Sequence, residues 1–197
     1  MNLPNRLTVT RLGLTVVFVM ALLLPHFPWG KTVALLVFAV AGLTDWLDGR
    51  IARQRGQETN FGALLDPVAD KVLTSAAFIC FIEQRDAGDH ALVQAWMALV
   101  IIAREFLVTG LRLVAQQQGV VLKAERLGKH KTISQMVTII LVLIGLAARD
   151  DWGFTAERFD VIFAEAVFWL MIVTVALTVW SGFAYFWKNR ELFLNDA

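Results

Sequence analysis

The chain has little charge and almost no cysteine, and both shortages limit what it can be. Of its 197 residues, 18% are charged and 57% are hydrophobic, and the mean hydropathy is +0.61. Soluble domains carry about 25% charged residues, so this composition excludes that class and indicates an integral membrane protein. The single cysteine, Cys80, cannot form an intrachain disulfide, and we expect it to be a core residue.

Internal repeats, low-complexity segments and strand patterns are also absent from the sequence. It contains instead six long apolar runs separated by short loops. A helix needs about 20 mostly apolar residues to cross a bilayer. The sequence therefore predicts an all-α protein, with one membrane domain over residues 1–197 and six transmembrane helices. The runs lie at roughly 7–25, 32–53, 62–83, 91–117, 131–149 and 160–187. Asn60 is a plausible N-cap for the third helix, and Pro67 costs little there if the helix starts near residue 63 or later.

Positive charge is concentrated in alternate connections between these runs. Lys and Arg are enriched in cytoplasmic loops, so the basic connections should face the cytoplasm. The other connections are acidic or nearly neutral, as at Glu83, Asp86, Asp150 and Asp151. Both termini are therefore predicted to be cytoplasmic. The basic residues are Arg6, Arg11, Arg50, Arg53, Arg55, Lys123, Arg126, Lys129, Lys131, Lys188 and Arg190.

Four aspartates lie within or beside the second and third apolar runs. They are Asp45, Asp48, Asp66 and Asp70, in the stretch DWLDGRIARQRGQETNFGALLDPVAD. An Asp at the centre of a membrane helix costs roughly 2.5–3.5 kcal/mol, so four cost on the order of 10 kcal/mol. Four carboxylates with no Cys or His nearby suit hard cations such as Mg²⁺ or Mn²⁺. Two such cations would balance their charge.

The spacing of the aspartates places each pair on one face of a helix. Asp45 and Asp48 are three residues apart, and Asp66 and Asp70 are four apart. Brought together, the two faces would form a cleft lined by carboxylates and opening toward the cytoplasm. Small residues on these faces let a bulky ligand approach the backbone, and Arg53 and Arg55 place cations where a phosphate would sit. The small residues are Gly49, Ala52 and Gly62.

The pattern D-x2-D-G-x2-A-R-x8-G-x3-D-x3-D closely resembles the signature of the CDP-alcohol phosphatidyltransferases. All eight positions match without a gap, and the resemblance extends from PNRLTVTR through the sixth run. It implies six transmembrane helices in a homodimer, in the inner membrane of a bacterium, with membrane lipids and no nucleic acid as partners. It also implies phospholipid biosynthesis with CDP-diacylglycerol as donor, an alcohol as acceptor and CMP as product. The segments IAREFLVTGLR and LGKHKT look most like members whose acceptor is sn-glycerol 3-phosphate.

The resemblance also assigns roles to individual residues. Asp45, Asp48 and Asp66 would be the core ligands of two divalent cations, Mg²⁺ or Mn²⁺. Asp70 would complete the metal site and act as the general base. Asn5 and Thr8 share a helical face that would contact the nucleotide, although an interfacial lead-in explains them equally well. The full set of nucleotide-binding candidates is Asn5, Thr8, Asp48, Gly49, Ala52, Arg53, Thr59 and Gly62.

A second group of charges occurs in the fourth and fifth runs. Arg104, Glu105 and Arg112 lie in a long apolar segment, where ionisable residues suggest function. One acid and two bases would leave a free guanidinium for an anion, unless the group is a purely structural ion pair. Lys129 and Lys131 begin the fifth run, where topology alone would also explain them. We predict that Arg104, Arg112, Lys129 and Lys131 bind the acceptor phosphate.

Three alternative functions remain open from the sequence. The same chemistry could use another acceptor: inositol phosphate, serine or phosphatidylglycerol. A carboxylate-lined ion transporter would also place acids in a membrane cleft, but it favours broken helices and related halves, which the sequence lacks. An intramembrane prenyltransferase would use aspartates and Mg²⁺, but with two separated Asp-rich motifs on more than six helices. Release of CMP from CDP-diacylglycerol distinguishes transfer from the last two.

Overall fold

A computed structural model describes the chain over residues 3–25, 27–55, 60–86, 88–117, 126–154 and 156–190. Within these ranges, side chains are described for residues 9–25, 27–44, 71–86, 88–115, 130–154, 156 and 158–190. The described residues form six helices and no strand, apart from one isolated bridge between Arg85 and Ala91. The prediction of an all-α fold is therefore confirmed. The helices are α1 (Leu3–Leu23), α2 (Gly30–Arg55), α3 (Asn60–Ile82), α4 (Ala95–Gln117), α5 (Arg126–Asp150) and α6 (Glu157–Lys188).

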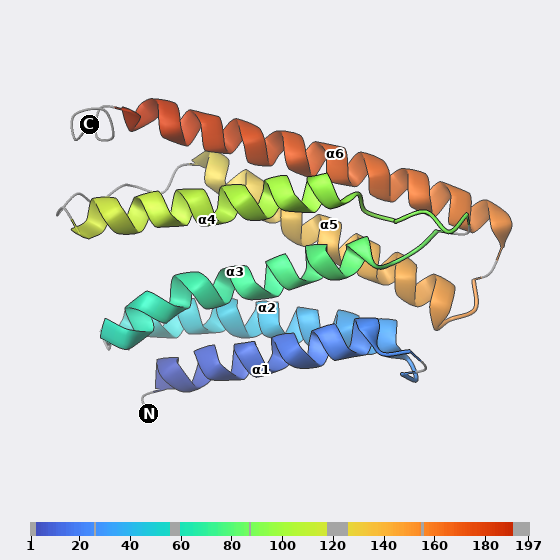
Figure 1. Ribbon diagram of the computed structural model, residues 1–197. Helices are drawn as coiled ribbons and strands as arrows, with labels where there is room; N and C mark the ends of the chain where they lie inside the picture. The colour runs from blue at the N-terminus through green and yellow to red at the C-terminus, as the bar shows by residue number, and fades with distance from the viewer. Residues whose placement is uncertain are drawn as a thin grey trace.

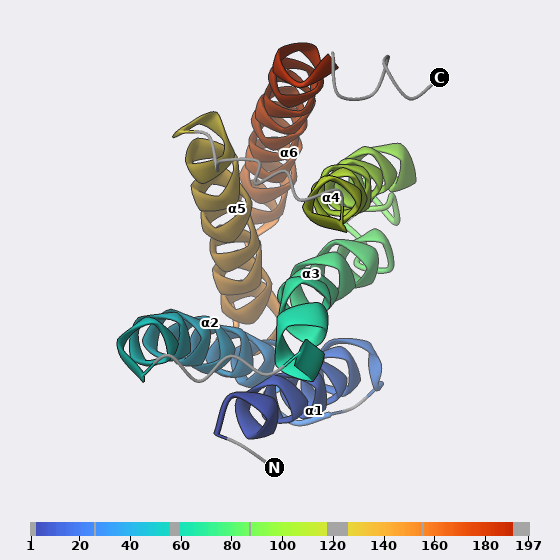
Figure 2. The same ribbon diagram turned by 90° about the vertical axis from the view of Figure 1, so that its left-hand side faces the viewer.

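The helices pack as two groups joined by α5. Helices α1, α2 and α3 form one group, and α4 and α6 pack against each other on the other side (Figures 1 and 2). Helix α5 contacts both α2 and α6, while α3 contacts α4. The first residues of α1 and the last residues of α6 lie at the same end of the molecule (Figure 1). Consecutive helices run in opposite directions, so after six of them the chain returns to the end at which it began.

All the helices except α4 begin a few residues before the predicted apolar runs. Helix α1 starts at Leu3 rather than near residue 7, so the polar opening segment is helical. Helix α3 starts at Asn60, the residue expected as its N-cap, so Pro67 lies beyond the first turn. An apolar run in the sequence marks only the apolar part of a helix. A polar first turn can extend the helix beyond that run. Interior proline is tolerated in membrane helices because neighbouring groups satisfy the backbone carbonyl that it frees.

The core consists of aromatic and aliphatic side chains at the helix contacts. Phe18 of α1 and Phe38 of α2 meet with ring centroids 6.0 Å apart, and both are buried. Phe81 of α3 and Leu143 of α5 are fully buried in the same cluster. Cys80 is also buried there, as the sequence predicted. This continuous apolar core fixes the positions of the polar side chains discussed below.

The outer surface is unusually apolar. Along α6, Trp169, Trp180, Phe183 and Trp187 each expose more than half of their surface. Exposed apolar area on this scale marks a membrane or partner surface. Among the described residues, His130–Asp150 and Arg158–Lys188 are long and apolar enough to span a bilayer. Shorter apolar helical segments occur at Val9–Leu23, Gly30–Thr44 and Lys71–Ile82.

One glycine in α5 permits a close helix contact, and its substitution should destabilise the fold. A Cβ at Gly145 would overlap the ring of Phe163, which is buried on α6 and stacks on Phe159 at 5.9 Å. Gly145→Ala should therefore lower the free energy of unfolding by about 1–3 kcal/mol. Thermal unfolding in detergent measures this. In Gly42→Ala the new Cβ meets nothing within 4 Å, so this control should be neutral or slightly stabilised. Equal melting temperatures for the two variants would contradict the prediction.

Candidate active site

Helices α2 and α3 carry the four aspartates. Asp45 and Asp48 lie in the last part of α2, and Asp66 and Asp70 in the first part of α3. Helix α2 ends and α3 begins at the same end of the molecule (Figure 1), so both pairs lie in the halves of these helices that are nearer to that end. Their side chains lie outside the described part of the structure, so the metal site and the role of Asp70 stay predictions. The other nucleotide-binding candidates lie outside it too: Asn5, Thr8, Gly49, Ala52, Arg53, Thr59 and Gly62.

A buried cluster of charged side chains reaches this region through Lys71, and it brings three helices together. Glu105 of α4 is only 4% exposed. Its Oε1 accepts hydrogen bonds from Lys131 Nζ of α5 and, at 3.1 Å, from Gln135 Nε2 of α5. Its Oε2 lies 3.0 Å from Lys71 Nζ of α3, the residue that follows Asp70. The carboxylate thus links α3, α4 and α5 beside the predicted general base.

Arg104 extends this cluster to α6. One guanidinium nitrogen, Nη1, lies 3.8 Å from Glu105 Oε1, and the other, Nη2, donates to Ser181 Oγ at 3.1 Å. A Cβ at Gly182 would lie 3.0 Å from Arg104 Cγ, so a glycine here lets the arginine lie against α6. Among the described side chains, three cations, Lys71, Arg104 and Lys131, surround one carboxylate. The cluster therefore carries excess positive charge, which favours anion binding.

The sequence found this cluster only in part. It allowed Glu105 to pair with Arg104 or Arg112. Arg104 Nη1 does lie 3.8 Å from the carboxylate, but Lys131 and Lys71 lie closer to it. It predicted Lys131 as a phosphate ligand, and the structure places that side chain in a buried contact with Glu105. It did not single out Lys71 or Gln135. Spacing offered one signal for Gln135, which lies one helical turn after Lys131.

The two remaining acceptor candidates differ in what the structure describes. Arg112 is exposed, and its Cζ lies 5.8 Å from the centroid of the Tyr185 ring on α6. The side chain of Lys129 lies outside the described residues, although the residue itself belongs to the first turn of α5. Arg104 and Arg112 therefore reach the same interface between α4 and α6. They do so two helical turns apart.

Hydroxyl groups between α5 and α6 continue from the Glu105 cluster. Gln135 Nε2 also lies 3.5 Å from Thr178 Oγ1. Thr174 Oγ1 lies 3.0 Å from Ser134 Oγ and 2.8 Å from Thr138 Oγ1. Hydrogen bonds between helices can hold membrane proteins together, since the surrounding lipid offers no competing partner. These hydrogen bonds between α5 and α6 should fix the orientation of the Gln135 side chain and, through it, that of Glu105.

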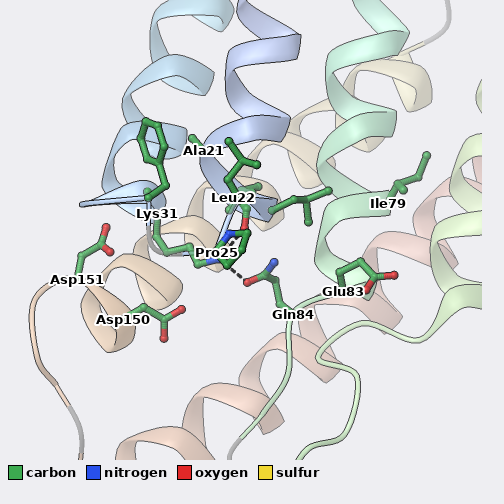
Figure 3. A pocket seen from close by; sticks show the side chains of 13 residues that line it. Ala21, Leu22, Pro25, Lys31, Ile79, Glu83, Gln84, Asp150 and Asp151 are labelled. Atoms are coloured by element: carbon green, nitrogen blue, oxygen red, sulfur yellow. Dashed lines mark hydrogen bonds between the residues drawn. The ribbon is translucent and has the colours of Figure 1, made fainter.

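A pocket of about 810 Å³ lies where α1, α3 and α5 end and α2 begins, away from the connection between α2 and α3 (Figure 3). Lys31 sits in it and donates to Leu22 O at 2.9 Å and Gln84 Oε1 at 2.7 Å. Asp151 accepts from the backbone and hydroxyl of Thr32, and so caps the start of α2. The polar groups of this pocket hold the helix ends together. We therefore assign it no part in the site.

The protein is therefore helical, with four aspartates on α2 and α3 and a group of cations around Glu105. Comparison with known proteins identifies its class. The profile of the CDP-alcohol phosphatidyltransferase family matches residues 1–180, so the chain belongs to this family of enzymes.

Individual relatives share one name. The "CDP-diacylglycerol--glycerol-3-phosphate 3-phosphatidyltransferase" of Bacillus subtilis (strain 168) is 40% identical to this chain, over 96% of each protein. That of Pseudomonas fluorescens is 34% identical, over 94% of this chain and 88% of the relative. That of Rickettsia bellii (strain RML369-C) is 32% identical, over 98% of this chain and 97% of the relative.

Proposed function

We propose that this chain transfers the phosphatidyl group of CDP-diacylglycerol to sn-glycerol 3-phosphate, giving phosphatidylglycerophosphate and CMP. The observation that carries this conclusion is near-full-length similarity to relatives named for that reaction. In the reaction, a hydroxyl oxygen of the acceptor bonds to the phosphorus that carries the diacylglycerol. The bond from that phosphorus to the CMP oxygen breaks, and the hydroxyl proton is removed. Family membership favours this transfer over the ion-transporter and prenyltransferase alternatives.

The four aspartates would hold the divalent cations. Asp45, Asp48, Asp66 and Asp70 are oxygen donors on two helix segments at one end of the bundle, a donor set that fits Mg²⁺ or Mn²⁺. Two such cations, when bound, neutralise the diphosphate and stabilise the leaving oxygen. Asp70 would take the proton from the acceptor hydroxyl. Lys71 follows it directly, and its contact with Glu105 ties the middle of α3 to α4.

The remaining site residues would hold the two substrates. The CDP group would lie against the small residues of α2 and α3, with Arg53 beside its phosphates. Asn5, Thr8 and Thr59 would contact the nucleotide, and Gly49, Ala52 and Gly62 would admit it. Arg104, Arg112, Lys129 and Lys131 would bind the phosphate of the acceptor. The excess of cations around Glu105 supports this assignment.

The membrane arrangement is part of the same proposal. All six helices of the domain, residues 1–197, would cross the inner membrane of a bacterium, with both termini and the active site at the cytoplasmic face. The chain would act as a homodimer among membrane lipids. The shared end of α1, α6 and the aspartate segments supports this topology (Figure 1). So do the exposed aromatic residues of α6.

Release of CMP by the purified protein tests the function. With CDP-diacylglycerol, Mg²⁺ and glycerol 3-phosphate, we expect CMP and phosphatidylglycerophosphate in equal amounts. Chelation by EDTA should stop turnover, and added Mg²⁺ or Mn²⁺ should restore it, because four carboxylates without metal repel the diphosphate. Inositol phosphate, serine, phosphatidylglycerol and glycerol are compared in parallel. Absence of CMP with every acceptor would refute phosphatidyl transfer, and preference for another alcohol would refute the assigned acceptor.

A further inference from the structure

The pocket where α1, α3 and α5 end is lined partly by apolar and partly by charged side chains (Figure 3). Its volume of about 810 Å³ lies in the range of sites that bind small molecules. The apolar side is formed by residues exposed on the outer surface of the bundle: Leu23, Leu24, Phe27 and Ile79. The charged side is formed by Lys31, Glu83, Asp150 and Asp151. A ligand that fills this pocket must therefore have an apolar part and a charged part.

Two tryptophans show the depth of this pocket in a bilayer. Trp29 and Trp152 directly follow or precede lining residues in the chain, and both are exposed. Trp152 Nε1 donates to Thr32 Oγ1 at 3.1 Å, which holds the indole at the start of α2. Tryptophan is enriched where lipid headgroups meet the acyl chains. In the proposed topology the pocket therefore opens among the headgroups of the extracytoplasmic leaflet, with its apolar side toward the acyl chains.

Lys31 has one proton left for an anionic ligand. An ammonium group has three N–H donors, and Lys31 uses two of them on neutral acceptors, Leu22 O at 2.9 Å and Gln84 Oε1 at 2.7 Å. Gln84 is buried and also donates to Cys80 O at 3.4 Å, so its position is fixed. A phosphate oxygen would give the third donor a charged acceptor, and hydrogen bonds between charged groups are stronger than those to neutral ones.

The acids of the pocket leave one carboxylate for a cation. Asp150 pairs with Arg149, and Asp151 accepts from the backbone and hydroxyl of Thr32. Glu83 is exposed, and its carboxylate has no hydrogen-bond or ion-pair partner among the described side chains. The pocket thus offers one contact to an anionic group and one to a cationic group. A zwitterionic headgroup supplies both.

We propose that this pocket binds a phospholipid whose headgroup carries a phosphate and a primary ammonium group, as in phosphatidylethanolamine. The phosphate accepts from Lys31, the ammonium group donates to Glu83, and the acyl chains lie along the apolar side. Phosphatidylcholine has the same phosphate but no N–H donor for the carboxylate, and phosphatidylglycerol has no cation. The bound lipid contacts the ends of α1 and α3 and stabilises the bundle there. This site goes beyond the proposed function and does not depend on it.

Lipid binding to the purified full chain in detergent tests this site. Native mass spectrometry measures the Kd of each lipid, and we expect that of phosphatidylethanolamine to be roughly tenfold to a hundredfold lower than those of phosphatidylcholine and phosphatidylglycerol, because one charged hydrogen bond contributes this much. At about a hundred times its Kd, phosphatidylethanolamine should raise the melting temperature by roughly 5–10 °C. Equal Kd values for phosphatidylethanolamine and phosphatidylcholine would overturn the proposal. Tightest binding of phosphatidylglycerol would overturn it too, since the pocket would then select an anion alone.

A single variant tests the carboxylate. Glu83→Gln changes an exposed side chain, so the fold should be kept, and the Kd of phosphatidylethanolamine should rise to that of phosphatidylcholine, which itself should not change. Glu165→Gln, an exposed acid of α6 outside the pocket, is the matched control and should keep the wild-type preference. Wild-type lipid preference in Glu83→Gln would refute the proposed contact.

Activity separates this site from the proposed function. Glu83→Gln should release CMP at the wild-type rate, because the pocket lies away from the connection between α2 and α3 that separates the two aspartate pairs. A protein that prefers phosphatidylethanolamine but releases no CMP would refute the proposed function and leave the lipid site standing. A protein that releases CMP but binds the three lipids equally would refute the lipid site alone.

Discussion

Asp70→Asn is expected to lower turnover by roughly 10²–10⁴-fold while CDP-diacylglycerol still binds. A general base typically contributes this much, since without it the acceptor hydroxyl attacks with its proton in place. Asparagine keeps the size of the side chain and one oxygen atom, and Asp45, Asp48 and Asp66 remain to hold a divalent cation. The measurement is steady-state CMP release, together with equilibrium binding of the donor in the presence of Mg²⁺.

Asp45→Asn is the comparison that separates the two roles. It removes a proposed metal ligand but not the base, so donor binding and turnover should both weaken, and a higher Mg²⁺ concentration should recover part of the loss. Asp70→Asn should not be recovered in this way. If Asp70→Asn kept more than about a tenth of wild-type turnover, the loss would be too small for a general base. Another group would then have to accept the proton.

Glu105→Gln is expected to destabilise the fold by about 3–5 kcal/mol, the usual cost of removing one partner from a buried ion pair. Glu105 is 4% exposed and Lys131 is 3% exposed, so water cannot solvate the Lys131 ammonium group once its partner loses its charge. Lys71 and Arg104 lose the same partner. Glutamine has nearly the same shape, so the effect reports charge rather than packing. Thermal or denaturant unfolding of the purified protein in detergent measures it.

Two further variants distinguish a specific pair from a general sensitivity to charge. Glu105→Gln with Lys131→Met removes both charges, and it should recover most of the stability that the single variant loses. Glu165→Gln changes an exposed acid of α6 and should have little effect. A double variant as unstable as Glu105→Gln would show that Lys131 is not the partner that matters. Wild-type stability in Glu105→Gln would show that the cluster is not tied together by its carboxylate.

The sequence by itself determined the helices and the chemistry of the aspartates. Helix positions follow from apolar runs, which are local, and the predicted centres of all six helices agree with the structure. The spacing of Asp45, Asp48, Asp66 and Asp70 also lies within short segments, so it identified the family correctly. Helix starts were less accurate, as at Leu3 of α1 and Arg126 of α5, because polar first turns carry no apolar signal.

Only the tertiary structure decided which charges meet. Lys71, Glu105 and Lys131 lie on three different helices, and no local spacing connects them. Sequence reasoning therefore considered only the arginines of α4 as partners for Glu105, and packing brought lysines from α3 and α5 closer still to its carboxylate. Tyr185 gave no signal either, because an aromatic residue near the end of an apolar helix is typical of a membrane interface. Its burial against α4, with Arg112 over the ring, depends on how α4 and α6 pack. A low-dielectric interior strengthens the interaction between nearby charges. The partners of a buried charge therefore depend on which helices packing brings together, and local spacing does not show this.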